Sequence, residues 1–205
     1  METGSLITNR PAGGATTGRN DARSISRHFA ACTIRRGRSS AERYLATPIG
    51  SAGFERLQHQ VIVDDCLGTG ELRLPIEVIR GALFEQLYLT DYRSVPSADL
   101  AAVPPIDYAA GYTSPVSAFV GNTIALGQFG DCVGRADSVG ARSLLTSLPD
   151  SSGETSAVHR LMPRLGACIP AGRKITFSKS VLRGAVAEGL YRLTRAAEQK
   201  PWGAN

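Results

Sequence analysis

The sequence RGALFEQLY at Arg80–Tyr88 is matched 103 residues later by RGAVAEGLY at Arg183–Tyr191, with six of the nine positions identical. Upstream, FAAC at Phe29–Cys32 corresponds to FGDC at Phe129–Cys132, and a second cysteine follows after 34 and 36 residues respectively. Three matches in the same order predict an internal duplication of a unit of about 65 residues.

Each half of the chain predicts the same run of elements. A helix through the first cysteine is followed by a short helix, a third helix that reaches the second cysteine, an extended segment and a last helix. We therefore predict a mainly α fold of two tandem helical repeats related by a pseudo-twofold axis. The extended segments 71–74 and 174–177 alternate in polarity and could pair between the halves as a two-stranded ribbon. Pro163 should kink or split the third helix of the second half.

The composition changes along the chain divide it into five parts. The first lacks periodicity and is rich in Gly and Thr, and the third is rich in Pro and Tyr. The predicted parts are a disordered basic arm (1–22), a first helical repeat (23–91), an extended linker laid over a surface (92–118), a second helical repeat (119–198) and a tail (199–205).

The matched nonapeptides place a glycine, a glutamate and a tyrosine on one helix face. Because a glycine inside a helix costs about 1 kcal/mol relative to alanine, its presence in both halves indicates a close backbone crossing. The arginines lie about 140° around the axis from the glutamates, so the two cannot pair within one helix. We expect each arginine to pair across the halves or with Asp64 and Asp65. The residues predicted to pack or bind between the halves are Arg80, Gly81, Glu85, Tyr88, Arg183, Gly184, Glu188 and Tyr191.

Glu85 and Glu188 also allow a catalytic interpretation. Two carboxylates in a shared cleft are suited to general acid/base work in a hydrolase or transferase, provided that they lie within about 10 Å of each other. The structural interpretation, in which they are half-buried partners of arginine, is favoured because a duplicated element keeps its packing first. No nucleophile, metal or oxyanion site accompanies them in the sequence, so no catalytic residue is assigned.

The four cysteines occupy equivalent places in the two halves. Cys32 with Cys66, and Cys132 with Cys168, fall on apolar stripes of helices, so a disulfide could join helices within each half. Small units need such crosslinks because their cores alone supply little stability. The alternative is four reduced core cysteines. No zinc site is expected, since there is no Cys-x-x-Cys and the three histidines do not recur between the halves. We expect no metal and no cofactor.

The charge is unevenly distributed. Eight arginines and three acidic residues fall in the first 43 residues, and the whole chain has a net charge of +5. This end could attract an anionic surface, so cytoplasmic nucleic-acid binding through it is an alternative function. A solvated tail and one helix face explain the same charges more simply.

The repeated pair of cysteines with the RGxxxExxY ending resembles a group of uncharacterised exported proteins of proteobacterial type. The resemblance covers about residues 25–92 and 119–198, implies a periplasmic setting and supplies no activity or ligand. This chain departs from it because residues 1–28 contain no apolar segment of a secretory signal. We expect a periplasmic or exported protein, with a cytoplasmic location as the alternative.

The sequence lacks the motifs of several function classes. It contains no membrane-spanning apolar run, no Gly-x-Ser-x-Gly, no His-Glu-x-x-His and no phosphate-binding loop. We therefore predict a non-catalytic binding or assembly module, a candidate subunit of a larger complex, with a protein as its partner and without nucleic-acid binding.

Overall fold

The computed structural model describes residues 4–9, 19–61, 64–66, 70–94, 99–113, 115–170 and 176–199. These residues confirm a mainly helical fold, with seven helices, one 3₁₀ turn and two short strands. In chain order the elements are β1 (Gly4–Asn9), α1 (Arg19–Ala46), α2 (Ala52–Val61), η1 (Asp64–Cys66), β2 (Gly70–Pro75), α3 (Ile76–Asp91), α4 (Ala118–Ala136), α5 (Ser138–Thr146), α6 (Ser152–Ala167) and α7 (Lys179–Ala197).

The helices follow one another in a similar order in the two halves. Helix α1 is interrupted at Gly37 (φ −151°, ψ 53°), and the backbone adopts a similar conformation at Asp137 (φ −159°, ψ 79°), between α4 and α5. The Asp137 side chain accepts a hydrogen bond from the Gly140 backbone N–H at 2.7 Å and so begins a new helix. Glycine offers no such side-chain cap, but the break at Gly37 still separates a short second helix from the longer one before it, as predicted for the first half, and both lie within α1.

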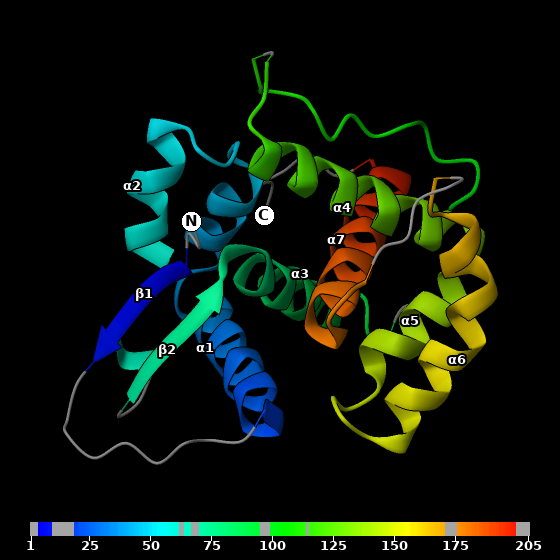
Figure 1. Cartoon of the computed structure of the whole chain (residues 1–205), viewed down its shortest axis with the longest axis horizontal. Helices are drawn as coiled ribbons and strands as arrows, with labels where there is room; N and C mark the ends of the chain where they lie inside the picture. The colour runs from blue at the N-terminus through cyan, green and yellow to red at the C-terminus, as the bar shows by residue number, and fades with distance from the viewer. Residues whose placement is uncertain are drawn as a thin grey trace.

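Helices α3 and α7 cross at the centre of the molecule (Figure 1). A Cβ atom on Gly81 would lie 2.5 Å from the Gly184 Cα, and one on Gly184 would lie 2.8 Å from the Gly81 Cα. The close backbone crossing predicted from the paired glycines is therefore present. Because α7 also packs against α4, and α3 against α1, these two central helices carry the core shared by both halves.

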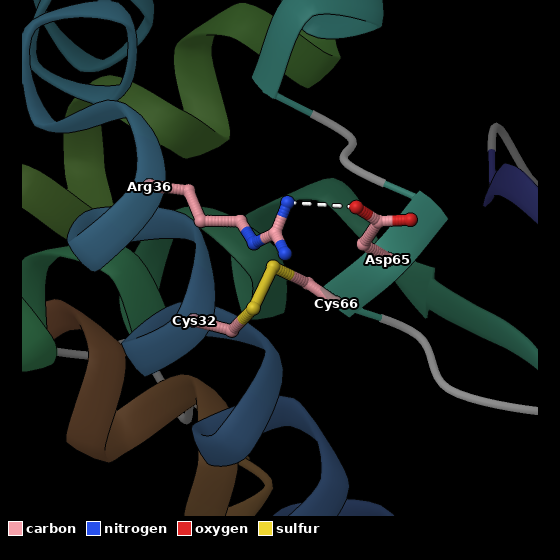
Figure 2. Close-up of a disulfide and its surroundings, with 4 residues drawn as sticks. All are labelled: Cys32, Arg36, Asp65 and Cys66. Carbon is pink, nitrogen blue, oxygen red and sulfur yellow. Dashed lines mark hydrogen bonds and ion pairs between the residues drawn. A yellow bond between two sulfur atoms is a disulfide. The ribbon is translucent and has the colours of Figure 1, made fainter.

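One disulfide closes each half. Cys32 is bonded to Cys66 with a Cα–Cα distance of 5.5 Å, and Cys132 to Cys168 at 5.8 Å, which confirms the crosslinks expected from their placement. Figure 2 shows Cys66 in the short η1 turn, beside the exposed ion pair between Arg36 and Asp65. The prediction that a third helix carries the second cysteine is wrong in detail: α2 ends at Val61, and in the second half Cys168 follows α6 as its C-cap.

The two-stranded ribbon differs from the predicted one. Strand β2 contains the extended segment 71–74, but it pairs antiparallel with β1 in the register Gly4↔Pro75 to Asn9↔Gly70. Of the other predicted segment, residues 174 and 175 lie outside the described residues, and Thr176 and Phe177 are not in a strand. The prediction of a disordered arm over 1–22 is consequently wrong for β1 and for the start of α1.

Of the two effects predicted for Pro163, a kink or a split of its helix, the split is absent. Pro163 lies on an exposed side of an uninterrupted helix from Ser152 to Ala167. Water can satisfy the carbonyl that loses its partner there, so the cost of the missing N–H is small on this face.

The linker is fixed to the second half by Arg135 of α4. Its guanidinium donates hydrogen bonds to the backbone carbonyls of Leu100, Val103 and Pro104, and it pairs with Asp131 at 2.5 Å. The segment Ile106–Tyr112 is thereby held between the end of α1 and the outer faces of α4 and α7.

We predict that Gly184→Ala destabilises the protein by about 1–3 kcal/mol, because the new methyl group would overlap the backbone of α3. Urea unfolding measures this change. The matched control is Gly121→Ala in α4, where a Cβ meets nothing within 4 Å. That substitution should stabilise the protein by up to about 1 kcal/mol through helix propensity. Equal effects of both substitutions would contradict the close crossing.

We also predict that reduction raises the intact mass by about 4 Da, two hydrogens for each disulfide. Mass spectrometry of the protein from its native cell, alkylated before and after reduction, makes this measurement. Alkylation of all four cysteines without reduction would show that the thiols are free in the cell.

Candidate functional site

Arg183 of α7 is buried at the end of α5. Its guanidinium donates from Nη1 to the Leu144 carbonyl at 2.8 Å and from Nη2 to the Leu145 carbonyl at 2.7 Å. These carbonyls belong to the last turn of α5, whose backbone acceptors have no partner within the helix. The positive charge of Arg183 also suits the negative end of that helix.

Arg80 of α3 takes the equivalent position at the end of α1. Its Nη1 lies 3.4 Å from the Tyr44 carbonyl oxygen and its Nη2 donates to the Leu45 carbonyl at 3.1 Å. Tyr44 and Leu45 precede Leu144 and Leu145 by 100 residues, so each repeated arginine caps the corresponding helix of its own half.

Arg183 also joins the two halves through Glu85. Arg183 Nε donates to Glu85 Oε2 at 2.7 Å and Nη2 to Oε1 at 2.9 Å, with both side chains less than a tenth exposed. This is the pairing across the halves that the sequence predicts. The alternative partner Asp65 binds the exposed Arg36 instead, and the side chain of Asp64 lies outside the described residues.

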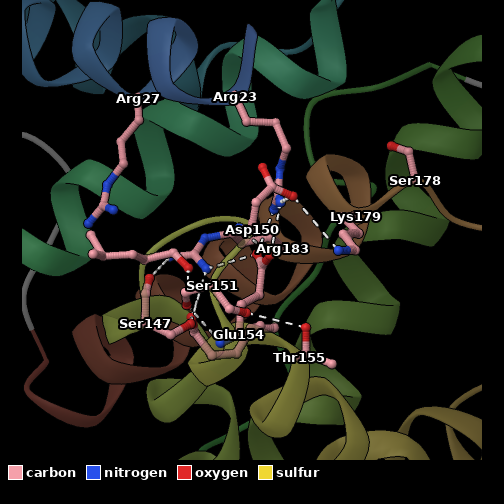
Figure 3. Close-up of polar contacts among 12 residues, drawn as sticks. Arg23, Arg27, Ser147, Asp150, Ser151, Glu154, Thr155, Ser178, Lys179 and Arg183 are labelled. Carbon is pink, nitrogen blue, oxygen red and sulfur yellow. Dashed lines mark hydrogen bonds and ion pairs between the residues drawn. The ribbon is translucent and has the colours of Figure 1, made fainter. Parts of the chain in front are cut away.

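Glu154 forms the centre of the same network, and sequence analysis did not identify it as a site residue. Figure 3 shows Arg23 and Arg183 approaching it from two sides. Arg23 binds its two carboxylate oxygens at 2.5 and 2.8 Å, Arg183 Nη1 lies 3.2 Å from Oε1, and the Asp150 backbone N–H donates to Oε2 at 2.8 Å. The side chain of Asp150 accepts from Arg23 at 2.6 Å.

The surroundings of Glu154 keep it ionised. Burial acts to raise the pKa of this carboxyl, but the hydrogen bonds from Arg23 and the Asp150 N–H, with the charges of Arg23 and Arg183, lower the pKa to about 2. The network of Arg23, Glu85, Asp150, Glu154 and Arg183 is called here the Arg183 network. Its two guanidinium groups pair with its three carboxylates, and Arg27, at 3.6 Å from Glu85, supplies a third positive charge.

Among the described residues of the first half, no equivalent of this network surrounds Arg80. Phe54 occupies the position of Glu154: its N–H donates to Ser51 Oγ at 3.1 Å, just as the Glu154 N–H donates to Ser151 Oγ. The Phe54 ring stacks on Tyr44 with a centroid distance of 4.8 Å. The described carboxylate that pairs with Arg80 is Glu188, at 4.0 Å.

Glu188 is held mainly by a neighbour on its own helix. Arg192 lies one turn further along α7 and binds Glu188 Oε1 at 2.8–2.9 Å. The Arg192 guanidinium also lies over the rings of Phe84 and Tyr108, at 5.3 and 5.4 Å from their centroids.

The two repeated glutamates line different cavities. Glu85 borders a cavity of about 30 Å³ with Arg23, Arg27 and Arg183, whereas Glu188 borders a cavity of about 320 Å³ on the other side of the helix crossing. Neither of these two cavities contains both carboxylates. Glu85 is occupied by Arg183, with Arg27 at 3.6 Å, and this arrangement does not favour general acid/base work by a glutamate pair.

The repeated tyrosines lie in an aromatic cluster and not beside a cleft. Tyr191 is fully buried, with its ring centroid 6.0 Å from that of Phe84 and 5.9 Å from that of Tyr92. Tyr88 lies 5.7 Å from Tyr92. Their place in the nonapeptide is explained by packing at the helix junction.

The arginines near the N-terminus are largely engaged within the protein. Arg23, Arg27, Arg36 and Arg38 each form an ion pair, and Arg38 binds Asp91 through two hydrogen bonds. Arg10 and the side chain of Arg19 lie outside the described residues. Most of the described arginines near the N-terminus therefore form ion pairs within the protein, and their number does not by itself indicate a basic surface.

Comparisons with known proteins identify no relative: no family model, no curated protein and no solved structure matches the chain. Within the described ranges, no group of three or more His, Cys, Asp or Glu side chains is placed to hold a metal ion. None of the helices in these ranges is long and apolar enough to cross a membrane.

We predict that the Arg183 network makes folding sensitive to acid. The pKa of Glu154 is about 2 in the folded protein against an ordinary value of 4.5. A carboxyl with a lowered pKa contributes stability above its unfolded pKa and loses it as the pH falls through this window. The free energy of unfolding should therefore decrease from pH 4.5 towards pH 2, as urea titrations would measure.

The variant Glu154→Gln isolates this effect. It should cost about 3 kcal/mol at neutral pH, because two buried guanidinium groups lose their charged partner, and its stability should change less over the acid window. Glu55→Gln, on an exposed position of α2, is the control. An acid dependence that persists unchanged in Glu154→Gln would assign it to other groups.

Proposed function

We propose that this protein is a non-catalytic binding or assembly module, built from an internal duplication, that works with a protein partner in the periplasm or another exported setting. The observation that carries the proposal is the Arg183 network. Glu85, the carboxylate considered for acid/base catalysis, is bound by Arg183 across the junction of α3 and α7. This pairing supports a structural role for these charged residues.

The two disulfides support the proposed compartment. Crosslinks of this kind persist in oxidising environments outside the cytoplasm, and each half of this chain has one. A module exposed to extracytoplasmic conditions gains most from such crosslinks when its units are small, as they are here.

The duplication is supported by details that chance would not place together. Equivalent arginines cap equivalent helices, equivalent serines begin α2 and α6, and equivalent cysteines are bonded. Two half-units with a common centre resemble the arrangement of a symmetric dimer within one chain.

The partner surface that we favour lies on α5 and α6. The three most exposed large apolar side chains among the described residues are Val139, Leu148 and Met162, which are 56–67% exposed. All three belong to α5, to α6 or to the turn between them, at one end of the molecule in Figure 1. We assign the partner surface to this helix pair because its three apolar side chains are the most exposed large ones among the described residues.

We predict that Leu148→Glu with Met162→Glu releases the protein from a complex that the wild type forms in its native cell. Size-exclusion chromatography with light scattering of gently prepared extracts measures the size of the complex. Charges at these positions would have to be buried without a partner in the interface, which costs several kcal/mol. Ser152→Glu with Ser156→Glu, at exposed polar positions of α6, is the matched control and should leave the complex intact.

Two results would contradict the proposal. The first is a wild-type protein that elutes as a 21.7 kDa monomer under all conditions. The second is turnover of a substrate that Glu85→Gln abolishes while the thermal unfolding midpoint is unchanged.

A further inference from the structure

The cavity of about 320 Å³ beside Arg80 has the features of a ligand site. It is enclosed by the end of α1, the linker segment Ile106–Tyr112 and side chains from α3, α4 and α7. Its volume lies at the lower end of the range for small-molecule pockets. The matching position beside Arg183 is filled by the chain itself.

Comparison of the two arginines shows what is missing beside Arg80. Arg183 has two carboxylate partners within 3.2 Å, whereas the described carboxylate partner of Arg80 is 4.0 Å away and is shared with Arg192. Arg80 is nevertheless just as deeply buried, with 5% of its surface exposed. A buried guanidinium is best stabilised by a close anion, usually through two parallel hydrogen bonds.

The differences between the halves account for this gap. Where the second half has Glu154, the first has Phe54, and where Arg23 reaches into the network, α4 has the smaller Thr123. Thr123 lines the cavity next to Arg80. The chain thus keeps the helix-capping arginine but supplies neither the second carboxylate nor the side chain that would close the space.

Other groups of the cavity fit the same kind of ligand. Tyr112 accepts a hydrogen bond from the Ile49 N–H at 2.9 Å, and its own hydroxyl hydrogen has no acceptor among the described residues. The Tyr108 ring lies against Gly127, where any Cβ would overlap it, and the Arg192 guanidinium lies 5.4 Å from the ring centroid. The remaining carboxylate, Asp107, is exposed and caps its own turn by accepting from the Ala109 N–H.

We propose that this cavity binds a small organic carboxylate with an aromatic or apolar body. The ligand's carboxylate would pair with Arg80, as Glu154 pairs with Arg183, and accept from the Tyr112 hydroxyl. Its body would lie against Tyr108 and the apolar wall formed by Ile106 and Ile124. This inference rests on the proposed binding function and adds the chemical class of one ligand.

The test is a titration of the full-length oxidised protein with phenylacetate and, separately, with phenylacetamide, its uncharged isostere. Amide chemical shifts in ¹H–¹⁵N spectra report both the affinity and the place of binding. We expect phenylacetate to bind with a dissociation constant on the order of 1 mM, a reasonable value for ten non-hydrogen atoms. The largest shifts should occur at Ile49, Tyr112 and Thr123, and phenylacetamide should bind at least about tenfold more weakly.

Variants at Thr123 separate binding from folding, because this side chain is half-buried at the cavity wall and takes no part in the Arg183 network. Thr123→Glu places a carboxylate of the chain beside Arg80 and should weaken phenylacetate binding at least about tenfold. Thr123→Gln has the same length without the charge and should change the affinity less than about threefold.

Three results would overturn the proposal: equal binding of the two ligands, shifts that map away from the cavity, or equal affinities of the Glu and Gln variants. Absence of phenylacetate binding at concentrations about tenfold above the expected constant would do the same. The assembly test substitutes residues 148 and 162, and neither of them lines this cavity. The failure of one proposal therefore leaves the test of the other unaffected.

Discussion

The close crossing of α3 and α7 at Gly81 and Gly184 is the constraint on which the rest of the structure depends. With no side chain at the crossing, the two backbones approach until a single Cβ would collide with the opposite helix. Only at this separation can Arg183 on α7 bind Glu85 on α3 through two hydrogen bonds. The cost of glycine inside a helix is offset by the packing and the ion pair that the approach allows.

The buried charges specify the arrangement of the halves more than they stabilise it. Removing charged groups from water costs several kcal/mol. The attraction between the paired charges roughly offsets this cost, so the net contribution to stability is small. A wrong docking of α7 on α3 would, however, leave Arg183, Glu85 and Glu154 buried without partners. The network therefore selects one register of the junction, while the apolar core and the two disulfides supply most of the stability.

Local patterns in the sequence predicted most helices and the disulfide pairs, because these depend on spacing within one half. The glycine crossing was predicted because a glycine recurs at the same position of both nonapeptides. The Arg23–Glu154 pair could not be predicted in this way, since 131 residues separate its members and neither lies in a matched motif. Glu154 was recognisable only as a helix-capping residue, and the charge on Arg23 looked like part of a basic end. Strand β1 was missed for a related reason: its pairing with β2 is set by proximity in the fold, and six residues carry too little pattern.

The different residues at two equivalent positions, Phe54 and Glu154, explain why the cavity beside Arg80 is larger than the one beside Arg183. A buried glutamate at 154 needs counter-charges and hydrogen-bond donors. Arg23 and Arg183 supply the positive charges, and the Asp150 N–H donates a hydrogen bond. A phenylalanine at 54 packs against an apolar neighbour, and its ring stacks on Tyr44. Because this side chain has no charge, it cannot serve as an ion-pair partner of Arg80. The capping arginine satisfies a helix end in both halves, although the described residues place no second carboxylate beside Arg80. Arg183 in the second half thus fixes the junction, whereas the equivalent Arg80 in the first half borders a cavity with room for the proposed ligand.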